Sequence, residues 1–320
     1  MLLKFVEQYL KYNKINLVNS TFIGFTVIIV IFGSLIIVVE PILPDFIKQS
    51  FRYGKHKHNG PAIALVNRIE VPKSWFRHFY IFAFTWALLA LYLIIKGIIT
   101  HTAAPQSVIE FLDFVAGGSE NRNILINSNS ALVASVLMTL QCGRRFYETN
   151  FVQIFSKEGK INIPYYVVGY LHYFGVILAL LLNTEGFVKG TLPSSFSLMK
   201  ITLVQYVGIC TFCFSWLQQY KSNMILVNLR KNPNTHKLET EKHLMPTGGF
   251  FNLVSSPHML FEILMYVSML SVVGKSFTWK LIVMWVSSNQ LIIALLTHKW
   301  YKENFKNYPK QRKALIPFLV

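Results

Sequence analysis

Apolar residues gather along this chain in long runs, which polar and basic segments separate. Seven runs approach the ~20 residues that a helix needs to cross the hydrocarbon core of a bilayer. They cover residues 22–39, 79–95, 124–142, 164–182, 201–217, 259–273 and 281–296. Because backbone in lipid must satisfy its own hydrogen bonds, each run predicts a helix. The pattern predicts an all-α, polytopic membrane protein with about seven transmembrane helices.

The composition agrees with this prediction. Hydrophobic residues make up 53% of the 320 residues, and charged residues make up only 14%. A soluble domain carries about 25% charged residues. The composition therefore excludes an ordinary soluble domain.

The net charge of +17 raises the question of a nucleic-acid partner, but the basic residues do not form one patch. Of the 31 Lys and Arg residues, 22 fall between runs one and two, three and four, and five and six, or after run seven. Cytosolic segments of membrane proteins carry such an excess of positive charge. The distribution predicts a lumenal N-terminus, a cytosolic C-terminus and no nucleic-acid partner.

Residues 246–262 form an unusual segment for a membrane chain. They contain two adjacent glycines, a Ser-Ser-Pro-His turn and Glu262 at the start of an apolar run. Irregular backbone at membrane depth occurs only where protein or an aqueous cavity satisfies its polar groups. An ionisable residue in such a place marks a functional site by default. The segment predicts the lining of a site, and the alternative is a connecting loop before the sixth helix.

A second carboxyl group, Glu70, stands between Arg68 and Lys73, just ahead of the second apolar run. Pro72 disfavours helical backbone in the residue before it, so the segment predicts a turn. A carboxyl group shielded from water at this depth can keep its proton and act as a general acid. The alternative is a solvated loop carboxylate beside Arg68 and Lys73.

Arginines and a basic tail offer binding groups for phosphate. Arg144 and Arg145 end the third run, where arginines either anchor a helix at the cytosolic side or form bidentate pairs with phosphate. The tail after residue 296 is basic and aromatic and closes on an apolar end. Such a tail is typical of a membrane anchor, and a phosphate-binding lid has the same composition.

After the fifth run, Gln219, Asn223 and either Leu226 or Arg230 are spaced to share one face of a helix. That polar face suits the sugar and phosphates of a nucleotide, and an exposed helix beside the membrane is the alternative. The sequence shows no strand pattern and no G-x-G-x-x-G, so it does not favour a Rossmann domain. Any dinucleotide would have to be held by helices within the bundle.

Cys210 and Cys213 form a C-x-x-C pair, which elsewhere indicates a redox or zinc site. Here the pair lies inside an apolar run and has no second pair to complete a ligand set. The position predicts packing, and no metal site is predicted.

Several motifs resemble the C-terminal domain of the steroid 5α-reductase family. They are Val-Ser-Ser-Pro-His at 254–258 followed by Glu262, His-Lys-Trp-Tyr at 298–301, Tyr-Pro-Lys at 308–310 and Arg-Lys-Ala-Leu-Ile-Pro-Phe at 312–318. Gln-Tyr-Lys at 219–221, Leu-Arg-Lys-Asn at 229–232 and Arg-Tyr-Gly-Lys at 52–55 look most like the polyprenol reductase branch. With Val-Pro-Lys at 71–73 and His-Phe-Tyr at 78–80, the resemblance touches most of the chain.

The resemblance implies an NADPH-dependent reductase of the endoplasmic reticulum membrane. Its substrate would be a long-chain polyprenyl lipid, polyprenal or polyprenol, whose α-isoprene double bond is reduced to give dolichal or dolichol for protein N-glycosylation. Hydride would add to the β-carbon while an acid hydrogen-bonds the carbonyl oxygen. Residues 1–130 would form a transmembrane half with the acid, and 131–320 the NADPH-binding half of one integrated bundle.

The family pattern also implies residue roles. Glu70 takes the position of the catalytic acid. Steroid-acting members pair that acid with a tyrosine, but the matching residue here is Gln141, which can hydrogen-bond an oxygen and cannot protonate it. This departure argues against a steroid 3-ketone. The implied cofactor-binding residues are Arg144, Gln219, Asn223, Arg230, His258, Glu262, His298, Tyr301 and Arg312.

Within that set, Arg144 and Arg230 are the candidates for the phosphates, and His258 and Glu262 would lie nearer the nicotinamide amide and ribose. The family usually has a basic residue two positions before the proline at 246, where this chain has Leu244. At that position the sequence therefore does not match the family's contact with the 2′-phosphate of NADPH.

Two alternatives to polyprenyl reduction stay open. One is a steroid or enoyl-CoA reductase of the same family. The other is a seven-span receptor or transporter, although a transporter is expected to show internal repeats and the sequence has none. Binding of NADPH would distinguish a reductase from a receptor or transporter, because a receptor does not need this cofactor.

Overall fold

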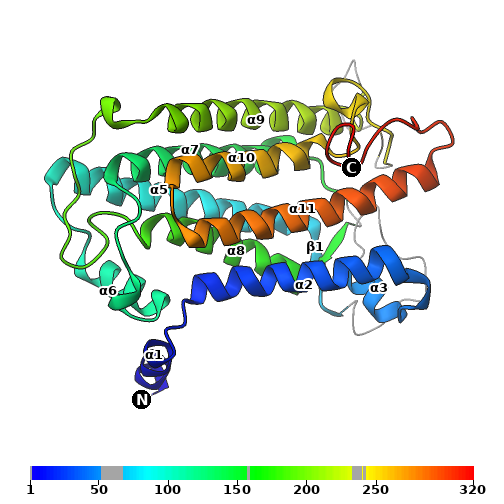
Figure 1. The fold of residues 1–320 in the computed structure, drawn as a ribbon. Helices are drawn as coiled ribbons and strands as arrows, with labels where there is room; N and C mark the ends of the chain where they lie inside the picture. The colour runs from blue at the N-terminus through cyan, green and yellow to red at the C-terminus, as the bar shows by residue number, and fades with distance from the viewer. Residues whose placement is uncertain (1, 52–67, 157–158, 233–239, 241–242) are drawn as a thin grey trace.

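The computed structural model of the chain describes residues 2–51, 68–156, 159–232, 240 and 243–320, so the motif at 52–55 lies outside the described residues. Long helices lie side by side in one bundle, and α9 ends and α10 begins near the C-terminus (Figure 1). The helices are α1 (Leu2–Tyr12), α2 (Leu17–Val39), α3 (Asp45–Phe51), α5 (Phe76–Thr100), α6 (Gln106–Ala116), α7 (Ser128–Tyr147), α8 (Ile163–Leu181), α9 (Leu203–Asn228), α10 (Pro257–Val273) and α11 (Phe277–Asn304).

Four helical segments are long and apolar enough to cross a membrane, namely Leu17–Ile42, Lys73–Thr100, Ile163–Leu181 and Phe277–Asn304. Helix α10 is apolar as well but has only 17 residues. Each of the seven predicted runs lies largely within a helix, although α9 and α11 extend well past the ends of their runs. The mostly helical fold is therefore confirmed, whereas the count of seven spans and the orientation of the termini stay predictions.

Helices α7 and α9 are not among these four candidate spans, and both turn polar side chains inward. Helix α7 buries Gln141 and Arg144, and α9 buries Gln219 and Ser222. Polar residues within a membrane bundle are expensive, and they face the bundle interior or a cavity when they occur. A functional site is therefore expected beside the inner faces of α7 and α9.

Two short strands correct the expectation that the chain has none. Strand β1 (Glu70–Pro72) pairs antiparallel with β2 (Lys160–Asn162), with Glu70 opposite Asn162 and Pro72 opposite Lys160. Three residues are too few to show the alternation by which a strand is found in a sequence. This ribbon ties the start of α5 to the start of α8, and it is too small to form a nucleotide-binding sheet.

Small residues bring the helices close together. Helix α5 presents Ala83, Ala87 and Ala90, all buried, where it packs along α7. Gly33 of α2 lies against Ile292 of α11. Because lipid removes the hydrophobic drive between helices, close van der Waals packing over small residues holds such a bundle together.

Gly208 makes the tightest of these approaches and gives a test of the packing. A Cβ atom at this position would lie 1.7 Å from Ser271 Oγ and 2.9 Å from the carbonyl oxygen of Ser268, both on α10. We expect Gly208→Ala to push α9 from α10 and to destabilise the protein by about 1–3 kcal/mol, since overpacking is costly. A lower thermal unfolding midpoint in detergent would show this. Gly24→Ala is the control, because a Cβ there meets nothing within 4 Å; equal midpoints for the two variants would contradict the prediction.

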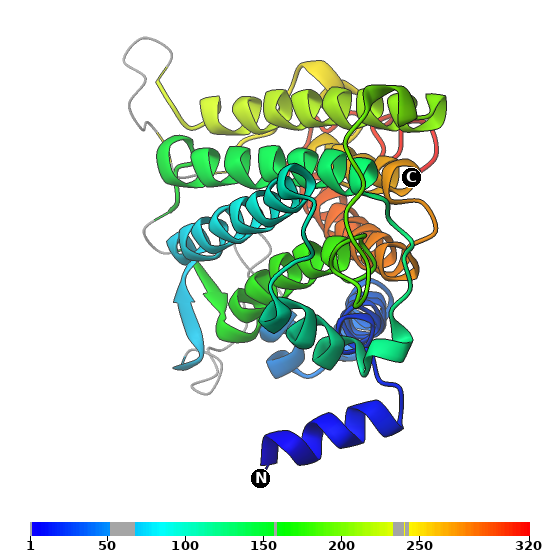
Figure 2. The same ribbon diagram turned by 90° about the vertical axis from the view of Figure 1, so that its left-hand side faces the viewer.

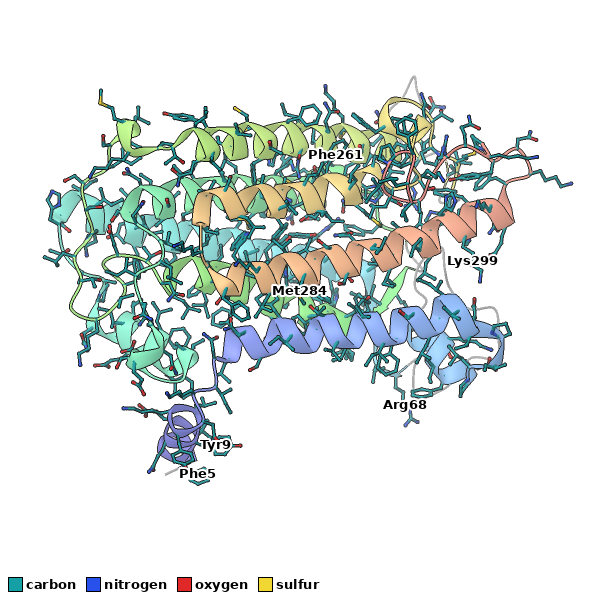
Figure 3. The ribbon with its side chains drawn as sticks, viewed as in Figure 1. Phe5, Tyr9, Arg68, Phe261, Met284 and Lys299 are labelled. Carbon is teal, nitrogen blue, oxygen red and sulfur yellow. The ribbon has the colours of Figure 1, made fainter. Side chains whose placement is uncertain are left out.

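The surface of the bundle suits a lipid environment. Met284 of α11 is 51% exposed and projects from the flank of the bundle, as do many other apolar side chains (Figure 3). At one end of the bundle, Lys299 donates to Glu40 Oε2 at 3.0 Å and joins α11 to the end of α2. At the other end, α1 lies apart from the bundle in both ribbon views, with Phe5 and Tyr9 exposed (Figure 2).

Candidate active site

A cavity of about 260 Å³ opens between six helices of the bundle. Its wall takes residues from α5, α7, α8, α9, α10 and α11, so it depends on the whole bundle rather than on one half of the chain. The lining residues are Phe76, Phe79, Tyr80, Arg145, Tyr165, Val168, Gly169, His172, Tyr173, Gln219, Asn223, His258, Met259, Glu262, Trp285, Val286, Asn289 and Gln290.

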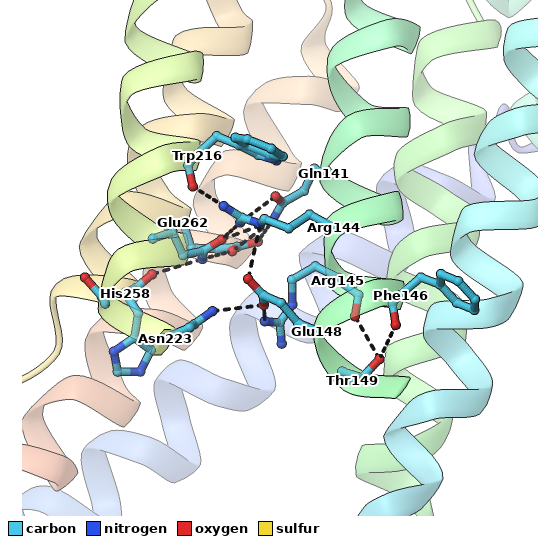
Figure 4. A network of polar contacts seen from close by, with 12 residues as sticks. Gln141, Arg144, Arg145, Phe146, Glu148, Thr149, Trp216, Asn223, His258 and Glu262 are labelled. Carbon is cyan, nitrogen blue, oxygen red and sulfur yellow. Dashed lines mark hydrogen bonds and ion pairs between the residues drawn. The ribbon is translucent and has the colours of Figure 1, made fainter. Parts of the chain in front are cut away.

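One wall of the cavity is a buried polar network (Figure 4). The carboxylate of Glu262 accepts hydrogen bonds from Gln219 Nε2 and, at 3.2 Å, from Gln141 Nε2. Arg144 donates to the side-chain oxygens of Gln141, at 2.7 Å, and of Gln219. Gln219 also donates to the backbone oxygen of His258 at 3.0 Å, which fixes the start of α10 against α9. The two glutamines thus link a buried carboxylate to a buried guanidinium.

Glu148 connects a second group of charges to this network. Its carboxylate pairs with Arg145, lies 3.5 Å from Arg144 Nε, and accepts from Asn223 Nδ2 at 3.0 Å. The Glu148 side chain is only 1% exposed. Arg145 in turn donates to Tyr80 Oη at 3.0 Å. The negative charge of Glu148 compensates the positive charges of the two arginines, because a buried charge must be paired and hydrogen-bonded.

The opposite wall is aromatic. Phe79 stacks on Tyr173 with ring centroids 6.3 Å apart, and Tyr80 lies 5.5 Å from the same ring. His172 completes this wall, because it bonds to Tyr266 Oη at 3.0 Å and accepts from Trp285 Nε1 at 3.2 Å. Both ring nitrogens of His172 are therefore engaged. The cavity joins a charged, hydrogen-bonding side to an apolar side.

Behind the cavity, the C-terminal tail holds the irregular segment before α10 in place. Ser255 Oγ lies 2.7 Å from His298 Nδ1 and bonds to Tyr308 Oη, and the backbone N–H of Ser255 donates to Lys313 O at 2.8 Å. Burial raises the pKa of the Tyr308 hydroxyl, which therefore stays protonated as a donor or acceptor.

The other two tail residues of the predicted set complete this packing. Tyr301 stacks on Tyr308 with centroids 6.0 Å apart. Arg312 is buried and donates to the backbone oxygen of Pro246 at 3.1 Å. The tail thus supports the backbone that carries His258 and Glu262.

Comparison with known proteins identifies the family. The family model described as 3-oxo-5-alpha-steroid 4-dehydrogenase matches residues 169–320. Over 319 residues the chain is 53% identical to a polyprenal reductase of Drosophila melanogaster, covering 100% of this chain and 98% of that relative. It is 34% identical to a polyprenal reductase of Caenorhabditis elegans, over 84% of this chain and 85% of the relative. For the polyprenal reductase of Homo sapiens the identity is 33%, over 84% of each chain.

The chain belongs to the polyprenal reductase branch of the steroid 5α-reductase family. As a member of this branch it is an oxidoreductase that acts on a CH–CH group. The receptor or transporter alternative is therefore wrong. The resemblance drawn from the short motifs of the sequence is confirmed.

The structure of this reductase brings most of the predicted cofactor residues to one place. Gln219, Asn223, His258 and Glu262 line the cavity, and Arg144 belongs to the same hydrogen-bonded network. Gln219 and Asn223 lie one helical turn apart on α9, as their spacing predicts. His298, Tyr301 and Arg312 form the supporting layer behind this wall and are not among its lining residues.

Arg230 lies apart from the cavity. Helix α9 ends at Asn228, so the helical spacing that links Gln219 to Asn223 does not extend to residue 230. Arg230 donates to Ile154 O at 3.0 Å and bonds to His243 Nδ1 at 3.1 Å. Its role in cofactor binding stays a prediction.

Glu70 and Gln141, the predicted catalytic residues, do not line the cavity. The Glu70 side chain is 11% exposed on β1, where Lys160 Nζ lies 3.7 Å from its carboxylate. The side chain of Gln141 is occupied at both ends by Glu262 and Arg144. Their catalytic roles stay predictions, and Gln141 belongs to the polar network beside the cavity.

Reasoning from the sequence missed Glu148, Tyr80 and the aromatic wall. The signal for Glu148 was available, because it follows Arg145 and Arg144 by three and four residues, the spacing of helical ion pairs. Tyr80 and Tyr173 read as ordinary aromatic residues of apolar runs. Only the packing of α5 against α7 and α8 shows that they face the cavity.

The cysteine prediction is corrected in part. Cys142 is buried, but Cys210 and Cys213 are exposed on the outer side of α9 and do not pack into the core. All three thiols are free. In the part of the chain that the structure describes, no three His, Cys, Asp or Glu side chains gather into a group that could hold a metal ion.

Proposed function

We propose that this chain is an NADPH-dependent polyprenal reductase of the endoplasmic reticulum membrane, which saturates the α-isoprene double bond and so supplies dolichol for N-glycosylation. The relatives that cover nearly all of the chain carry the name polyprenal reductase. The observation that carries the proposal is the cavity, where a buried polar wall faces an aromatic one. Such a site suits a polar dinucleotide head beside an isoprenoid chain.

The residues of the polar wall fit the head of a reduced nicotinamide nucleotide. Glu262 offers a carboxylate and Asn223 an amide, the groups that recognise a carboxamide and ribose hydroxyls. Across the cavity, Asn289 Oδ1 is buried and has no hydrogen-bond partner among the described residues. A buried unpaired acceptor costs about 1–3 kcal/mol, so a ligand that donates to it would be favoured. When bound, NADPH would supply a hydride to the lipid.

The aromatic wall fits the other partner. Phe79, Tyr173 and Trp285 present apolar faces to the cavity, and an isoprene unit placed on them loses contact with water. Exclusion of water also strengthens every electrostatic interaction within the site. The wall would thus hold the double bond next to the polar network while the long tail stays in the bilayer.

Steroid reduction is the second candidate, because the matching family model is described as 3-oxo-5-alpha-steroid 4-dehydrogenase. The replacement of the expected tyrosine by Gln141 argues against it. A higher rate with a 3-oxo-Δ4 steroid or with an enoyl-CoA than with polyprenal would favour these alternatives.

The direct test is a reaction in reconstituted membranes. Purified protein in vesicles is incubated with polyprenal and NADPH, and saturation of the lipid is followed by mass spectrometry. We expect a gain of two hydrogens per lipid that depends on NADPH. Absence of saturation in a protein that shows an NADPH-dependent thermal shift would remove the polyprenal assignment and leave the cofactor assignment standing.

Arg230 gives a separate test of the phosphate assignment. Arg230 and Lys73 lie close enough for their positive charges to repel, and a bound phosphate would relieve that repulsion. A hydrogen bond to a charged group contributes about 1.5–3 kcal/mol, so Arg230→Ala is expected to raise the KM for NADPH about tenfold or more. Selectivity among lipids should not change. Lys221→Ala, which removes an exposed charge on α9, is the control; an unchanged KM in Arg230→Ala would leave Arg230 as a membrane anchor.

A further inference from the structure

The reduction of a conjugated aldehyde needs a proton donor near the carbonyl oxygen, and the lining of the cavity offers a candidate besides Glu70. Glu70 lies on β1 next to Lys160 and does not line the cavity. Gln141 cannot donate an acidic proton, and its amide is bonded to Glu262 and Gln219. A donor that already borders the cavity is found among the lining residues themselves.

Tyr80 has the required position. It stands in the second turn of α5, its side chain is largely buried, and it lines the cavity together with Phe76 and Phe79. Its neighbours Phe79 and Tyr173 form the aromatic wall. A phenol at this place would face the head of a lipid whose isoprene chain lies along that wall.

Arg145 prepares the Tyr80 hydroxyl for proton donation. Its Nη2 donates to Tyr80 Oη at 3.0 Å, and its guanidinium also lies 4.8 Å from the centre of the ring. Because Oη accepts this hydrogen bond, its own O–H is free to donate to a ligand. The fixed positive charge stabilises negative charge that develops on Oη as the proton leaves. Glu148 pairs with the guanidinium of Arg145 and holds it in place. Asn223 in turn donates a hydrogen bond to the Glu148 carboxylate.

Several neighbouring hydroxyl and imidazole groups are less suited than Tyr80. His172 is bonded through both ring nitrogens to Tyr266 and Trp285. Tyr166 and Tyr170 bond to each other and are not among the lining residues. The hydroxyl of Tyr80, in contrast, accepts a hydrogen bond from Arg145.

We propose that Tyr80, supported by Arg145, is the catalytic residue that donates a proton to the carbonyl oxygen of the α,β-unsaturated aldehyde, an inference that rests on the proposed function. When bound, NADPH would supply the hydride that adds to the β-carbon, and the electrons of the double bond would move toward the carbonyl. Tyr80 gives its proton to the oxygen, and the resulting enol becomes the saturated aldehyde when the α-carbon gains that hydrogen. Water returns a proton to Tyr80, so each turnover consumes one NADPH and one proton.

Tyr80→Phe tests the proposal, because it removes one oxygen atom and keeps the ring. We expect kcat with polyprenal to fall about 100-fold or more, the usual contribution of a general acid, with the KM for NADPH unchanged. Glu70→Gln is measured in parallel, because Glu70 takes the position of the catalytic acid in the family pattern. Tyr170→Phe is the matched control, since this tyrosine lies outside the cavity on the neighbouring α8 and is expected to keep wild-type activity.

A second readout does not depend on turnover. Dolichal, the saturated aldehyde, is bound without cofactor, and its carbonyl stretch is recorded by isotope-edited infrared spectroscopy. A hydrogen bond from Tyr80 weakens the carbonyl bond, so the stretch should lie at lower wavenumber in the wild type and in Tyr170→Phe than in Tyr80→Phe. A merely structural role for Tyr80 would not move it.

The outcomes separate the inference from the proposed function. An active wild type whose rate and carbonyl stretch are unchanged in Tyr80→Phe overturns the role of Tyr80 alone. A loss confined to Glu70→Gln overturns it in favour of Glu70. A wild type that neither binds dolichal nor reduces polyprenal removes the proposed function and this inference together.

Discussion

Replacing Glu262 with glutamine is expected to lower kcat/KM for NADPH about 100-fold, since a charge-assisted hydrogen bond contributes about 1.5–3 kcal/mol and 1.4 kcal/mol is tenfold. The carboxylate of Glu262 accepts from Gln141 and Gln219 and borders the cavity. A glutamine amide at position 262 would turn its own N–H groups toward the donor N–H groups of Gln141 and Gln219. The loss of charge and the unpaired donors would both weaken the binding of a nicotinamide head.

The measurement is the dissociation constant for NADPH together with the rate on polyprenal. Glu303→Gln is the matched control, because it removes an exposed carboxylate at the end of α11. The folded state is checked by the thermal unfolding midpoint without cofactor. Equal NADPH affinity in the wild type and Glu262→Gln would mean that the polar wall does not hold the cofactor.

Replacing Glu148 with alanine is expected to cost about 3–5 kcal/mol of stability, because it leaves buried cations without their counter-charge. Glu148 pairs with Arg145, lies 3.5 Å from Arg144 Nε and accepts from Asn223. Its side chain is 1% exposed, so water cannot take over its role. The same change would release the guanidinium that orients Tyr80, and activity should fall with stability.

Thermal unfolding in detergent checks this second prediction. Glu110→Ala is the control, since Glu110 is an exposed acid of α6 whose contact with Gln106 is a surface one. We expect a large drop in the unfolding midpoint for Glu148→Ala and almost none for Glu110→Ala. Similar midpoints for the two variants would show that the arginines of α7 do not depend on a buried carboxylate.

The fold was largely predictable because one physical rule governs it. Backbone in lipid must be helical, so long apolar runs such as 22–39 and 79–95 identify their helices directly. This rule does not predict the short strands or the direction in which polar side chains face within the bundle. The β1–β2 ribbon is too short to leave a pattern, and the inward direction of the polar residues of α7 follows from packing against neighbouring helices.

The site was predictable where a local spacing carries the information. Gln219 and Asn223 are one turn apart, and Glu262 stands out as an acid at the edge of an apolar run. Tyr80 and Trp285 could not be assigned in this way, because they come from α5 and α11, which meet only in the folded bundle. Glu70 resembles a catalytic acid in its sequence context, yet the strand that carries it lies outside the cavity.

The proposed reaction is tested by following the hydrogen that NADPH transfers to the lipid. Polyprenal is reduced with NADPH that carries deuterium at the transferable position of its nicotinamide ring, and the lipid product is analysed by NMR. We expect a saturated α-isoprene unit with deuterium on the β-carbon. Deuterium on the carbonyl carbon of an unsaturated alcohol would contradict it, because the enzyme would then reduce the aldehyde and leave the double bond intact.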